Sequence, residues 1–263
     1  MKIVILPGTA EPALEPGSAT AAPADGHGFA LGSDDGRWLL VDVSSEVAGQ
    51  LLGGELNLSP WAGAAAVLPL LLTDARRGHL EGLHALIGGM PVDLYATPSV
   101  FEDFTAQLQR RPPALPGCPV HWQLLPVAGD RVVADFTVEG LPTLEFTALA
   151  IAGGGPAAAD RPPQVGDRLA MSVRDLISGQ TLFCTSGASR IGSFELEWMA
   201  RADCLLIDGR LAPGSAPDAD WFGQIARLPA RHKLLLPTEG GCPDARLAEF
   251  GIEWAYQGME IAL

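Results

Sequence analysis

The sequence predicts an α/β sandwich of two β-sheets flanked by helices. Strand-like apolar segments are grouped in the first two-thirds of the 263-residue chain. In the last third, strand-like and helix-like segments alternate, a pattern typical of layered α/β folds. The chain is long enough to bury one large core, and 48% of its residues are hydrophobic. No obvious linker interrupts it, so we expect a single domain over residues 1–263.

Hydrophobic spacing, turn residues and capping residues define the elements of the N-terminal half. Asp34-Asp35-Gly36 predicts a hairpin turn. Ser44 and Thr97 are placed as N-caps, and Pro98 suits a first helical turn. The predicted strands are 2–6, 28–33, 37–43, 65–72 and 92–96, and the predicted helices are 44–50, 79–87 and 97–109. The Pro-rich segment Gly8 to Asp25 is expected to be an irregular loop.

The C-terminal half is read in the same way. The Gly/Ala/Pro-rich stretch Ala152 to Pro163 is expected to be a loop. The predicted strands are 121–127, 131–136, 144–151, 169–175, 181–184, 204–207 and 233–236, and the predicted helices are 194–201, 221–228 and 245–250. Two last strands, 252–255 and 259–263, are expected to pair with each other around Gln257-Gly258.

Composition excludes several classes of partner. The net charge of −14 and the 17 scattered basic residues argue against nucleic acid and anionic membranes, which bind mainly through Lys and Arg. The four cysteines form no CxxC pair, and Cys184 and Cys204 stand in apolar runs where a free cysteine behaves as a small buried hydrophobe. The N-terminal apolar run is too short for a signal peptide. We therefore expect a soluble, cytoplasmic protein.

The most informative segment is 71–83, in which an apolar strand leads into a polar loop that ends at a helix start. The loop reads Thr73-Asp74-Ala75-Arg76-Arg77-Gly78, and His79 follows it. This junction resembles that of metallo-β-lactamase-fold proteins, which place their first metal ligands there in a His-x-His-x-Asp-His pattern. The resemblance implies a metallo-β-lactamase-like αβ/βα sandwich.

Within that fold, the chain is identified as a divergent member of the PQQ-biosynthesis protein B family. That family has a Thr-Asp or similar pair followed by a short loop ending in Asp-His, and Asp74 and His79 fall on this pattern. The resemblance covers roughly two-thirds of the chain in the family's order. The further segments that carry it are 36–44, 95–103, 202–209 and 251–261.

The departures from the family pattern fall on the chemistry. Arg76 stands where many members of the fold have a second His, and Gly78 stands where the family has Asp. The Cys-x-Cys-x-x-Cys segment is replaced by residues 8–25, and a His-Arg pair appears here as Asp160-Arg161. A Gly-His-Leu stretch is missing around 211–218, and a late His is replaced by Pro237.

The resemblance leaves Asp74, His79 and Asp208, with Asp160 as an addition, as the vestigial catalytic and metal site. Three of them, Asp74, His79 and Asp208, are expected at strand ends on one edge of the sandwich. One His with two or three carboxylates makes a poor iron or zinc site, so we expect no resident cofactor, with weak divalent metal as the alternative. The alternative for His79 is a helix-start residue that hydrogen-bonds the loop, and Asp74 and Asp208 can equally be capping residues.

Arginine side chains supply a different kind of site. Arg76 and Arg77 follow Asp74 in the same loop, and Arg161 follows Asp160. A guanidinium group stays protonated, so it cannot ligate a metal, and it suits a carboxylate. We therefore name Arg76, Arg77, Asp160 and Arg161 as candidate ligand-binding residues. The alternative is that the two loop arginines are solvated.

Two functions follow from the resemblance. The first is a metal-poor, catalytically degenerate binding or scaffold protein in the biosynthesis of pyrroloquinoline quinone (PQQ) or a related peptide-derived cofactor. Its partners would be a small peptide-derived or tyrosine-derived ligand and other proteins of the pathway. The second is a metal-dependent hydroxylase or oxygenase that acts on a tyrosine-derived PQQ precursor with the reduced Asp/His site. Zinc hydrolase activity is disfavoured, because the His-x-His-x-Asp-His pattern is broken.

Overall fold

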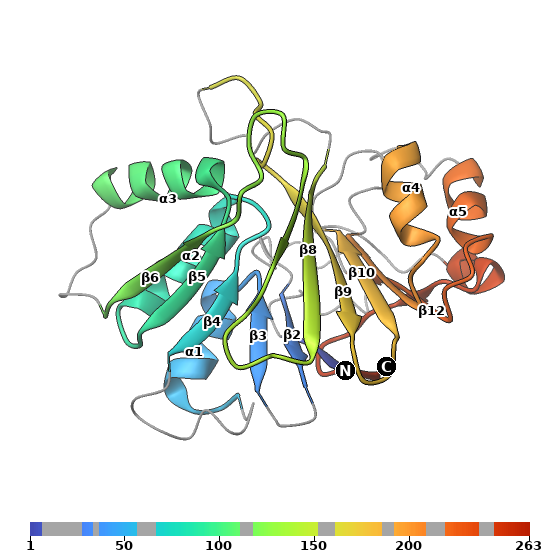
Figure 1. The fold of residues 1–263 in the computed structure, drawn as a ribbon. Helices are drawn as coiled ribbons and strands as arrows, with labels where there is room; N and C mark the ends of the chain where they lie inside the picture. The colour runs from blue at the N-terminus through green and yellow to red at the C-terminus, as the bar shows by residue number, and fades with distance from the viewer. Residues whose placement is uncertain are drawn as a thin grey trace, which may run out of the picture.

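The computed structural model shows two seven-stranded β-sheets packed face to face (Figure 1). It describes residues 1–6, 28–33, 37–56, 67–110, 118–151, 161–185, 192–208, 219–236 and 245–263. The first sheet has the order β14-β1-β2-β3-β4-β5-β6, and the second has the order β13-β12-β11-β10-β9-β8-β7. The chain returns to the first sheet with its last strand, so both termini lie at the same end of the molecule (Figure 1).

The first sheet is mixed. Strands β14, β1, β2 and β3 pair antiparallel, whereas β3, β4, β5 and β6 pair parallel. Its strands are β1 (Lys2–Ile5), β2 (Phe29–Gly32), β3 (Trp38–Val41), β4 (Leu68–Leu71), β5 (Val92–Ala96), β6 (Val120–Leu124) and β14 (Glu260–Ala262). The helices that connect the parallel strands are α1 (Ser45–Gly53), α2 (Arg77–Ile87) and α3 (Pro98–Arg110).

The second sheet is also mixed, with antiparallel strands at one side and parallel strands at the other. Its strands are β7 (Val133–Phe136), β8 (Leu144–Ala150), β9 (Leu169–Asp175), β10 (Thr181–Thr185), β11 (Cys204–Asp208), β12 (His232–Leu236) and β13 (Glu253–Trp254). The helical segments on this side are α4 (Ser193–Met199), α5 (Ala219–Ala226) and the 3-10 helix η2 (Ala245–Phe250).

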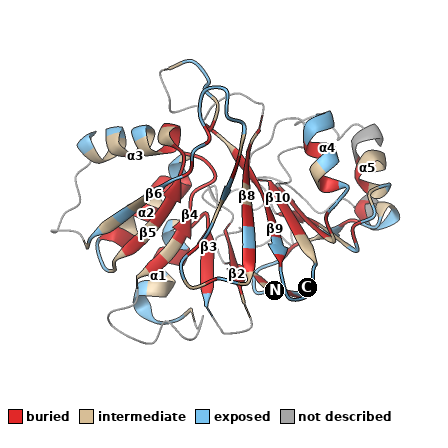
Figure 2. Ribbon diagram, viewed as in Figure 1, coloured by how far each residue is buried: buried red, intermediate tan, exposed pale blue. Residues whose placement is uncertain are grey.

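Three apolar cores hold the layers together. The central core lies between the sheets and contains residues such as Ile3, Leu39, Phe146 and Leu206. A second core packs the first sheet against α1, α2 and α3, and a third packs the second sheet against α4, α5 and η2. Figure 2 shows the result, with buried strands and with helices that are exposed on their outer sides. The predicted αβ/βα sandwich is confirmed.

Most predicted elements agree with the structure to within a few residues. The predicted caps are also present. Ser44 Oγ accepts a hydrogen bond from Val47 N at 3.2 Å, and Thr97 Oγ1 accepts one from Val100 N at 3.2 Å. The predicted pairing of the last two strands is wrong. Strand β13 pairs with β12 in the second sheet, whereas β14 pairs with β1 in the first. The turn after β13 therefore carries the chain from one sheet to the other.

Two close approaches fix the strand ends that matter for the site. A Cβ atom on Gly82 of α2 would lie 1.8 Å from the carbonyl oxygen of Val43, so only glycine lets α2 pack this closely on the end of β3. A Cβ atom on Gly28 would lie equally close, 1.8 Å, to the carbonyl oxygen of Asp42. The first contact packs α2 on the segment that follows β3, and the second packs the start of β2 on the backbone of Asp42.

Candidate functional site

The loop between β4 and α2 lies where the two sheets meet. The peptide nitrogen of Leu169, in β9, donates to the carbonyl oxygen of Thr73 at 2.9 Å, and the backbones of Asp74 and Arg168 form an antiparallel bridge. Residues of the first sheet's loop are thus held by the backbone of the second sheet. Side chains from this loop and from the end of β3 form a buried cluster of Asp42, Asp74, Arg76 and His79.

Asp42 anchors the cluster at the end of β3. Its φ of 50° is the one positive φ among non-glycine residues in the described ranges. Its Oδ1 accepts the peptide N–H of Thr73 at 2.9 Å, and its Oδ2 accepts the Thr73 hydroxyl at 2.5 Å. Burial raises the pKa of Asp42, and the nearby Asp74 carboxylate adds to this, while His79 and the Thr73 hydroxyl oppose it. Left-handed backbone at a polar residue beside a loop is a feature of strained, positioned sites.

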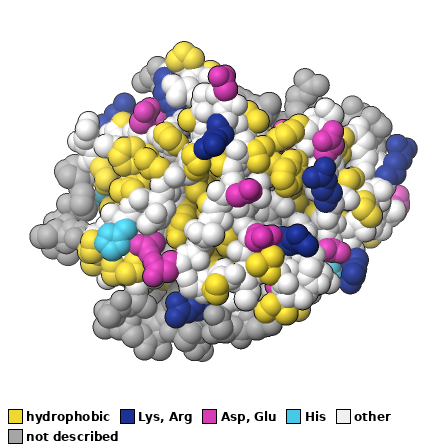
Figure 3. Space-filling model, viewed as in Figure 1, with side chains coloured by type: hydrophobic (Ala, Val, Ile, Leu, Met, Phe, Trp, Pro, Cys, Tyr) yellow, Lys and Arg dark blue, Asp and Glu magenta, His cyan; other side chains and the backbone are white. Residues whose placement is uncertain are grey.

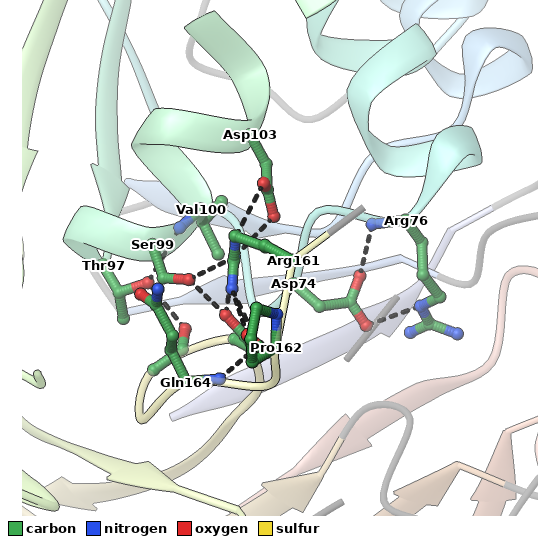
Figure 4. Close-up of polar contacts among 11 residues, drawn as sticks. Asp74, Arg76, Thr97, Ser99, Val100, Asp103, Arg161, Pro162 and Gln164 are labelled. Atoms are coloured by element: carbon green, nitrogen blue, oxygen red, sulfur yellow. Dashed lines mark hydrogen bonds and ion pairs between the residues drawn. The ribbon is translucent and has the colours of Figure 1, made fainter. Parts of the chain in front are cut away.

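Asp74 and Arg76 form an ion pair inside the loop. Arg76 Nε lies 2.5 Å from Asp74 Oδ2, and the Arg76 peptide N–H donates to Asp74 Oδ1 at 3.0 Å. The Asp74 side chain is completely buried, and that of Arg76 is 13% exposed. Burial alone would raise the pKa of Asp74, but the Arg76 guanidinium and then His79 outweigh it and hold the pKa well below its usual range. Asp74 is therefore a carboxylate at neutral pH. Figure 4 shows the two side chains pointing toward each other.

His79 lies in the first turn of α2 and is fully buried. Its Nδ1 is 2.8 Å from Asp74 Oδ1 and 3.2 Å from Asp42 Oδ1, so the imidazole is held between two carboxylates. Its Nε2 has no hydrogen-bond partner among the described residues. A buried polar atom without a protein partner is costly, so this nitrogen is available to a ligand or to an ordered water.

Thr185 supplies a second atom of this kind, on the second sheet. It ends β10, where it is in register with Ala170 of β9 and Ile207 of β11. Its Oγ1 is buried and lacks a hydrogen-bond partner in the part of the chain that the structure describes. Because Ala170 follows Leu169, which bonds Thr73, Thr185 lies on the same edge of the sandwich as the buried cluster.

A second arginine, Arg161, forms a separate polar network next to this edge, which we call the Arg161 clamp. Its Nη2 lies 2.9 Å from Asp103 Oδ2 and 2.7 Å from Asp167 Oδ1, and it donates to Ser99 Oγ at 2.6 Å. Gln164 N also donates to Asp167, at 2.8 Å. Hydrogen bonds from Arg161 and Ser99 outweigh the effect of burial and lower the pKa of Asp167. The clamp ties the segment before β9 to the first turns of α3 (Figure 4).

The structure brings only some of the predicted residues together. Asp74, His79 and Arg76 converge, and Arg76 points inward. Arg77 does not join them, because its side chain is 69% exposed and pairs with Glu81 at 2.8 Å. The Arg161 side chain is 20% exposed, and its guanidinium makes its contacts within the clamp.

Two further candidates are only partly or not at all described. Asp208 ends β11, beside Leu236 in register, and the structure describes its backbone only. Asp160 lies outside the described residues, as do the predicted loop 8–25, most of the predicted loop 152–163 and the segment 211–218, where the Gly-His-Leu stretch is missing.

Sequence reasoning missed Asp42 and the acidic partners of Arg161. A signal for Asp42 was available, because it directly follows an apolar strand whose parallel neighbour β4 leads into Thr73 and Asp74. The ends of adjacent parallel strands meet at one edge of a sheet. No local pattern indicated Asp103 or Asp167, which are 64 residues apart in the sequence (167 − 103) and meet only through Arg161.

Comparison with known proteins places this chain in a family. The Beta-lactamase superfamily domain matches residues 37–232, which include the whole β4–α2 loop. A coenzyme PQQ synthesis protein B of Klebsiella pneumoniae is 30% identical over 88% of this chain and 84% of its own length. The chain belongs to the coenzyme PQQ synthesis protein B family. The Pseudomonas aeruginosa protein of the same name is 28% identical over 94% of this chain and 90% of its own.

Solved structures of other proteins agree with this fold. Zinc-bound PqqB from Methylobacterium extorquens superposes with a TM-score of 0.68 at 18% identity and covers 100% of both chains. The short form of human tRNase Z superposes with a TM-score of 0.61 at 14% identity over 100% of this chain and 99% of its own. These coenzyme PQQ synthesis protein B and tRNase Z structures show that this chain has the family fold.

The buried cluster of this family member does not fit a divalent metal. Both oxygens of Asp74 face cationic or N–H groups of Arg76, so a metal ion there would lie against a fixed positive charge. Burial raises the pKa of Cys204 to about 12 and that of Cys184 higher still, so neither thiol offers a thiolate. No group of three or more His, Cys, Asp or Glu side chains among the described residues is arranged to hold a metal.

Two other expectations concern partners. No helix in the described ranges combines the length and apolar character needed to cross a bilayer. On the face shown in Figure 3, lysine and arginine side chains are scattered among acidic and apolar ones. The absence of nucleic-acid partners stays a prediction from the net charge of −14.

Proposed function

We propose that this chain acts in the biosynthesis of PQQ, or of a related peptide-derived cofactor, as a binding member of its family. Its ligand is a small peptide-derived or tyrosine-derived molecule that carries a carboxylate. The family relationship supports the pathway, because its relatives are named coenzyme PQQ synthesis protein B. The observation that carries the binding role is the inward-pointing Arg76 in the loop that other members of the fold use for metal.

Arg76 has the chemistry to recognise a carboxylate. The guanidinium is planar and permanently charged, and it presents N–H groups in a fork that matches a carboxylate. It faces the Asp74 carboxylate, which keeps it oriented and partly desolvated. A ligand carboxylate can therefore approach a cation whose position is already fixed, so that little side-chain entropy is lost on binding.

His79 and Thr185 supply the polar groups that a second part of the ligand would need. The Nε2 atom of His79 and the Oγ1 atom of Thr185 are buried and have no hydrogen-bond partners among the described residues. A ligand with hydrogen-bonding groups, such as a phenol or an amide, would satisfy such atoms. This gain is large for buried groups, because an unsatisfied donor or acceptor carries its full desolvation cost.

Calorimetry with short peptides that contain Glu and Tyr tests the proposal. Wild type and an Arg77→Ala variant should bind alike, because Arg77 is exposed and paired with Glu81. Arg76→Ala should weaken binding by about ten- to a hundredfold, which corresponds to the loss of a charge-assisted contact of about 1.5–3 kcal/mol. Circular dichroism checks that both variants are folded. Equal binding by wild type and Arg76→Ala, or none by either, would remove Arg76 from the function.

The competing function is a metal-dependent hydroxylase that uses Asp74, His79 and Asp208. Its distinguishing property is a tightly held metal. Purification without chelators, dialysis and metal analysis separate the two proposals. Stoichiometric iron in wild type that is lost in His79→Ala would support the hydroxylase and contradict a metal-free binding role.

A further inference from the structure

The buried cluster combines two acidic side chains with two nitrogen-bearing ones. Asp42 and Asp74 contribute two carboxyl groups, His79 contributes an imidazole between them, and Arg76 contributes the guanidinium. The side chains of the two aspartates and of His79 are at most 2% exposed, and the side chain of Arg76 is 13% exposed. Carboxylates this deeply buried require a cation or strong hydrogen bonds, because burying an unpaired charge is very unfavourable.

A guanidinium and a metal ion can meet that requirement, but not together. The Arg76 Nε atom is 2.5 Å from Asp74 Oδ2, which places the positive charge against one face of the carboxylate. Guanidinium nitrogen has no lone pair available for a metal, and its charge repels a dication. The Asp74 carboxylate is therefore already neutralised from within the chain, and Nδ1 of His79 already faces Asp74 and Asp42.

We propose that the Arg76 guanidinium is a built-in replacement for a metal ion, and that its charge closes a latent divalent-cation site on Asp74 and His79. Replacing Arg76 with histidine removes the competing charge. It also adds a nitrogen donor in the same loop, two residues after Asp74 and three before His79. Imidazole and carboxylate donors in one short loop suit Zn²⁺ and Co²⁺. The inference concerns the chain's response to metal, so it does not depend on the ligand proposed above.

Cobalt titration of the untagged, full-length chain tests this inference. Tetrahedral Co²⁺ absorbs strongly in the visible region, so binding is read directly and without any activity assay. Wild type should show no such absorption, whereas Arg76→His should develop it and saturate at one equivalent of Co²⁺. Adding His79→Ala to Arg76→His should lower the affinity for Co²⁺ by at least about a hundredfold, because a direct ligand is lost and the loss of an outer-shell partner alone costs about 10- to 100-fold.

Two control variants test separately whether the loss of the positive charge and the position of the new histidine matter. Arg76→Lys keeps a cation beside Asp74 and should bind no Co²⁺. Arg77→His adds the same imidazole one residue later, where the side chain is 69% exposed, and should also bind none. Binding by Arg77→His as well as by Arg76→His would overturn the proposal, because a surface histidine would then explain the signal.

Two further outcomes also overturn the inference. One is Co²⁺ or Zn²⁺ binding by wild type that His79→Ala abolishes, which would show that Arg76 does not close the site. The other is a folded Arg76→His variant that binds neither metal. If Arg76→His does not fold in EDTA, refolding with Zn²⁺ replaces the titration: metal-dependent folding supports the inference, and unfolding under both conditions contradicts it. Failure of the peptide calorimetry leaves each of these results unchanged.

Discussion

Arg76 and Arg161 both form ion pairs with aspartates, and their two clusters lie close together in the fold. Asp167 of the Arg161 clamp directly precedes Arg168, whose backbone forms a bridge with that of Asp74 in the buried cluster. The surroundings differ. In the Arg161 clamp, each described carboxylate receives hydrogen bonds from the guanidinium, and Asp167 receives others from Ser99 and Gln164. In the buried cluster, His79 is fully enclosed and still has a nitrogen without a hydrogen-bond partner among the described residues.

This difference separates a structural network from a candidate functional one. The clamp connects the segment before β9 to α3, and its hydrogen bonds account for its polar atoms. The buried cluster places its polar atoms deeper and satisfies them less completely, an arrangement that costs stability and is typical of sites that bind something. Four predictions, ordered from the largest expected effect to the smallest, test whether this contrast is real.

Arg76→Met should cause the largest loss of stability. It leaves the Asp74 carboxylate buried without its cation, and breaking a buried pair in this way costs about 3–5 kcal/mol. Urea denaturation measures the free energy of unfolding. Combining Arg76→Met with Asp74→Asn should recover part of the loss, because the uncompensated charge is then gone. A loss below about 1 kcal/mol would mean that the ion pair is solvated, and the contrast with the clamp would disappear.

Arg161→Met should cost less, about 1–2 kcal/mol in the same measurement, although Arg161 has more hydrogen bonds than Arg76 has with Asp74. Its side chain is 20% exposed and that of Asp103 is 19% exposed, so water can solvate the groups left behind. Adding salt should weaken the clamp more than the buried cluster, since exposed pairs are screened. A cost equal to that of Arg76→Met would show that depth of burial does not distinguish the two clusters.

The two aspartates of the buried cluster should respond to acid with opposite signs. Asp74 has a lowered pKa in the folded protein, so its contribution to stability is complete above its unfolded pKa of about 3.9 and is lost as the pH falls toward the folded value. Asp42 has a raised pKa, so its ionisation opposes folding as the pH rises from its unfolded pKa toward the folded value.

Unfolding midpoints in urea between about pH 3 and pH 7 measure both effects. Asp74→Asn should flatten the acid limb of the stability profile, and Asp42→Asn should steepen it. Asp167→Asn, in the clamp, should act in the same direction as Asp74→Asn, because its pKa is also lowered. A change in the same direction for the Asp42 and Asp74 variants would contradict the opposite pKa shifts of these two carboxyl groups.

Arg77→Ala should have the smallest effect, at most about 0.5 kcal/mol, because its exposed pair with Glu81 is an i,i+4 contact on the helix surface. The variant also serves as a baseline for its neighbour. A loss well above about 0.5 kcal/mol in the free energy of unfolding would indicate that Arg77 contributes to the buried cluster. That result would support the hypothesis, made from the sequence, that Arg76 and Arg77 act together.

The sequence predicted the layers of this fold because strand-like and helix-like periodicities are local. Residues 92–96 and 169–175 were bounded correctly by their apolar character alone. The pairing partners of the last two strands could not be predicted from local sequence. Both look like hairpin partners around Gln257-Gly258, yet β13 and β14 extend different sheets. Each of these strands pairs with the edge strand of a different sheet, and which edges are available depends on the topology of the whole chain.

The candidate site was predictable to the same degree. The loop motif brought Asp74, Arg76 and His79 into view, since they are within six residues of one another. The side-chain directions of Arg76 and Arg77 could not be read from the sequence. They differ because Arg76 precedes α2 and faces the buried Asp74, whereas Arg77 begins the helix and faces Glu81 one turn later. Asp42 needed knowledge of strand adjacency, which the structure supplied.

The hydrogen bond from Leu169 to Thr73 gives the loop a further property. It joins a strand of one sheet to a loop of the other through backbone atoms, next to the Asp74–Arg168 bridge. Opening the sandwich must break this bond, so the Leu169 amide proton should exchange with solvent only when the two halves separate. A molecule bound by Arg76 and His79 would tighten the same junction. Slower deuterium uptake at Leu169 would then report occupancy of the loop from the opposite half of the protein.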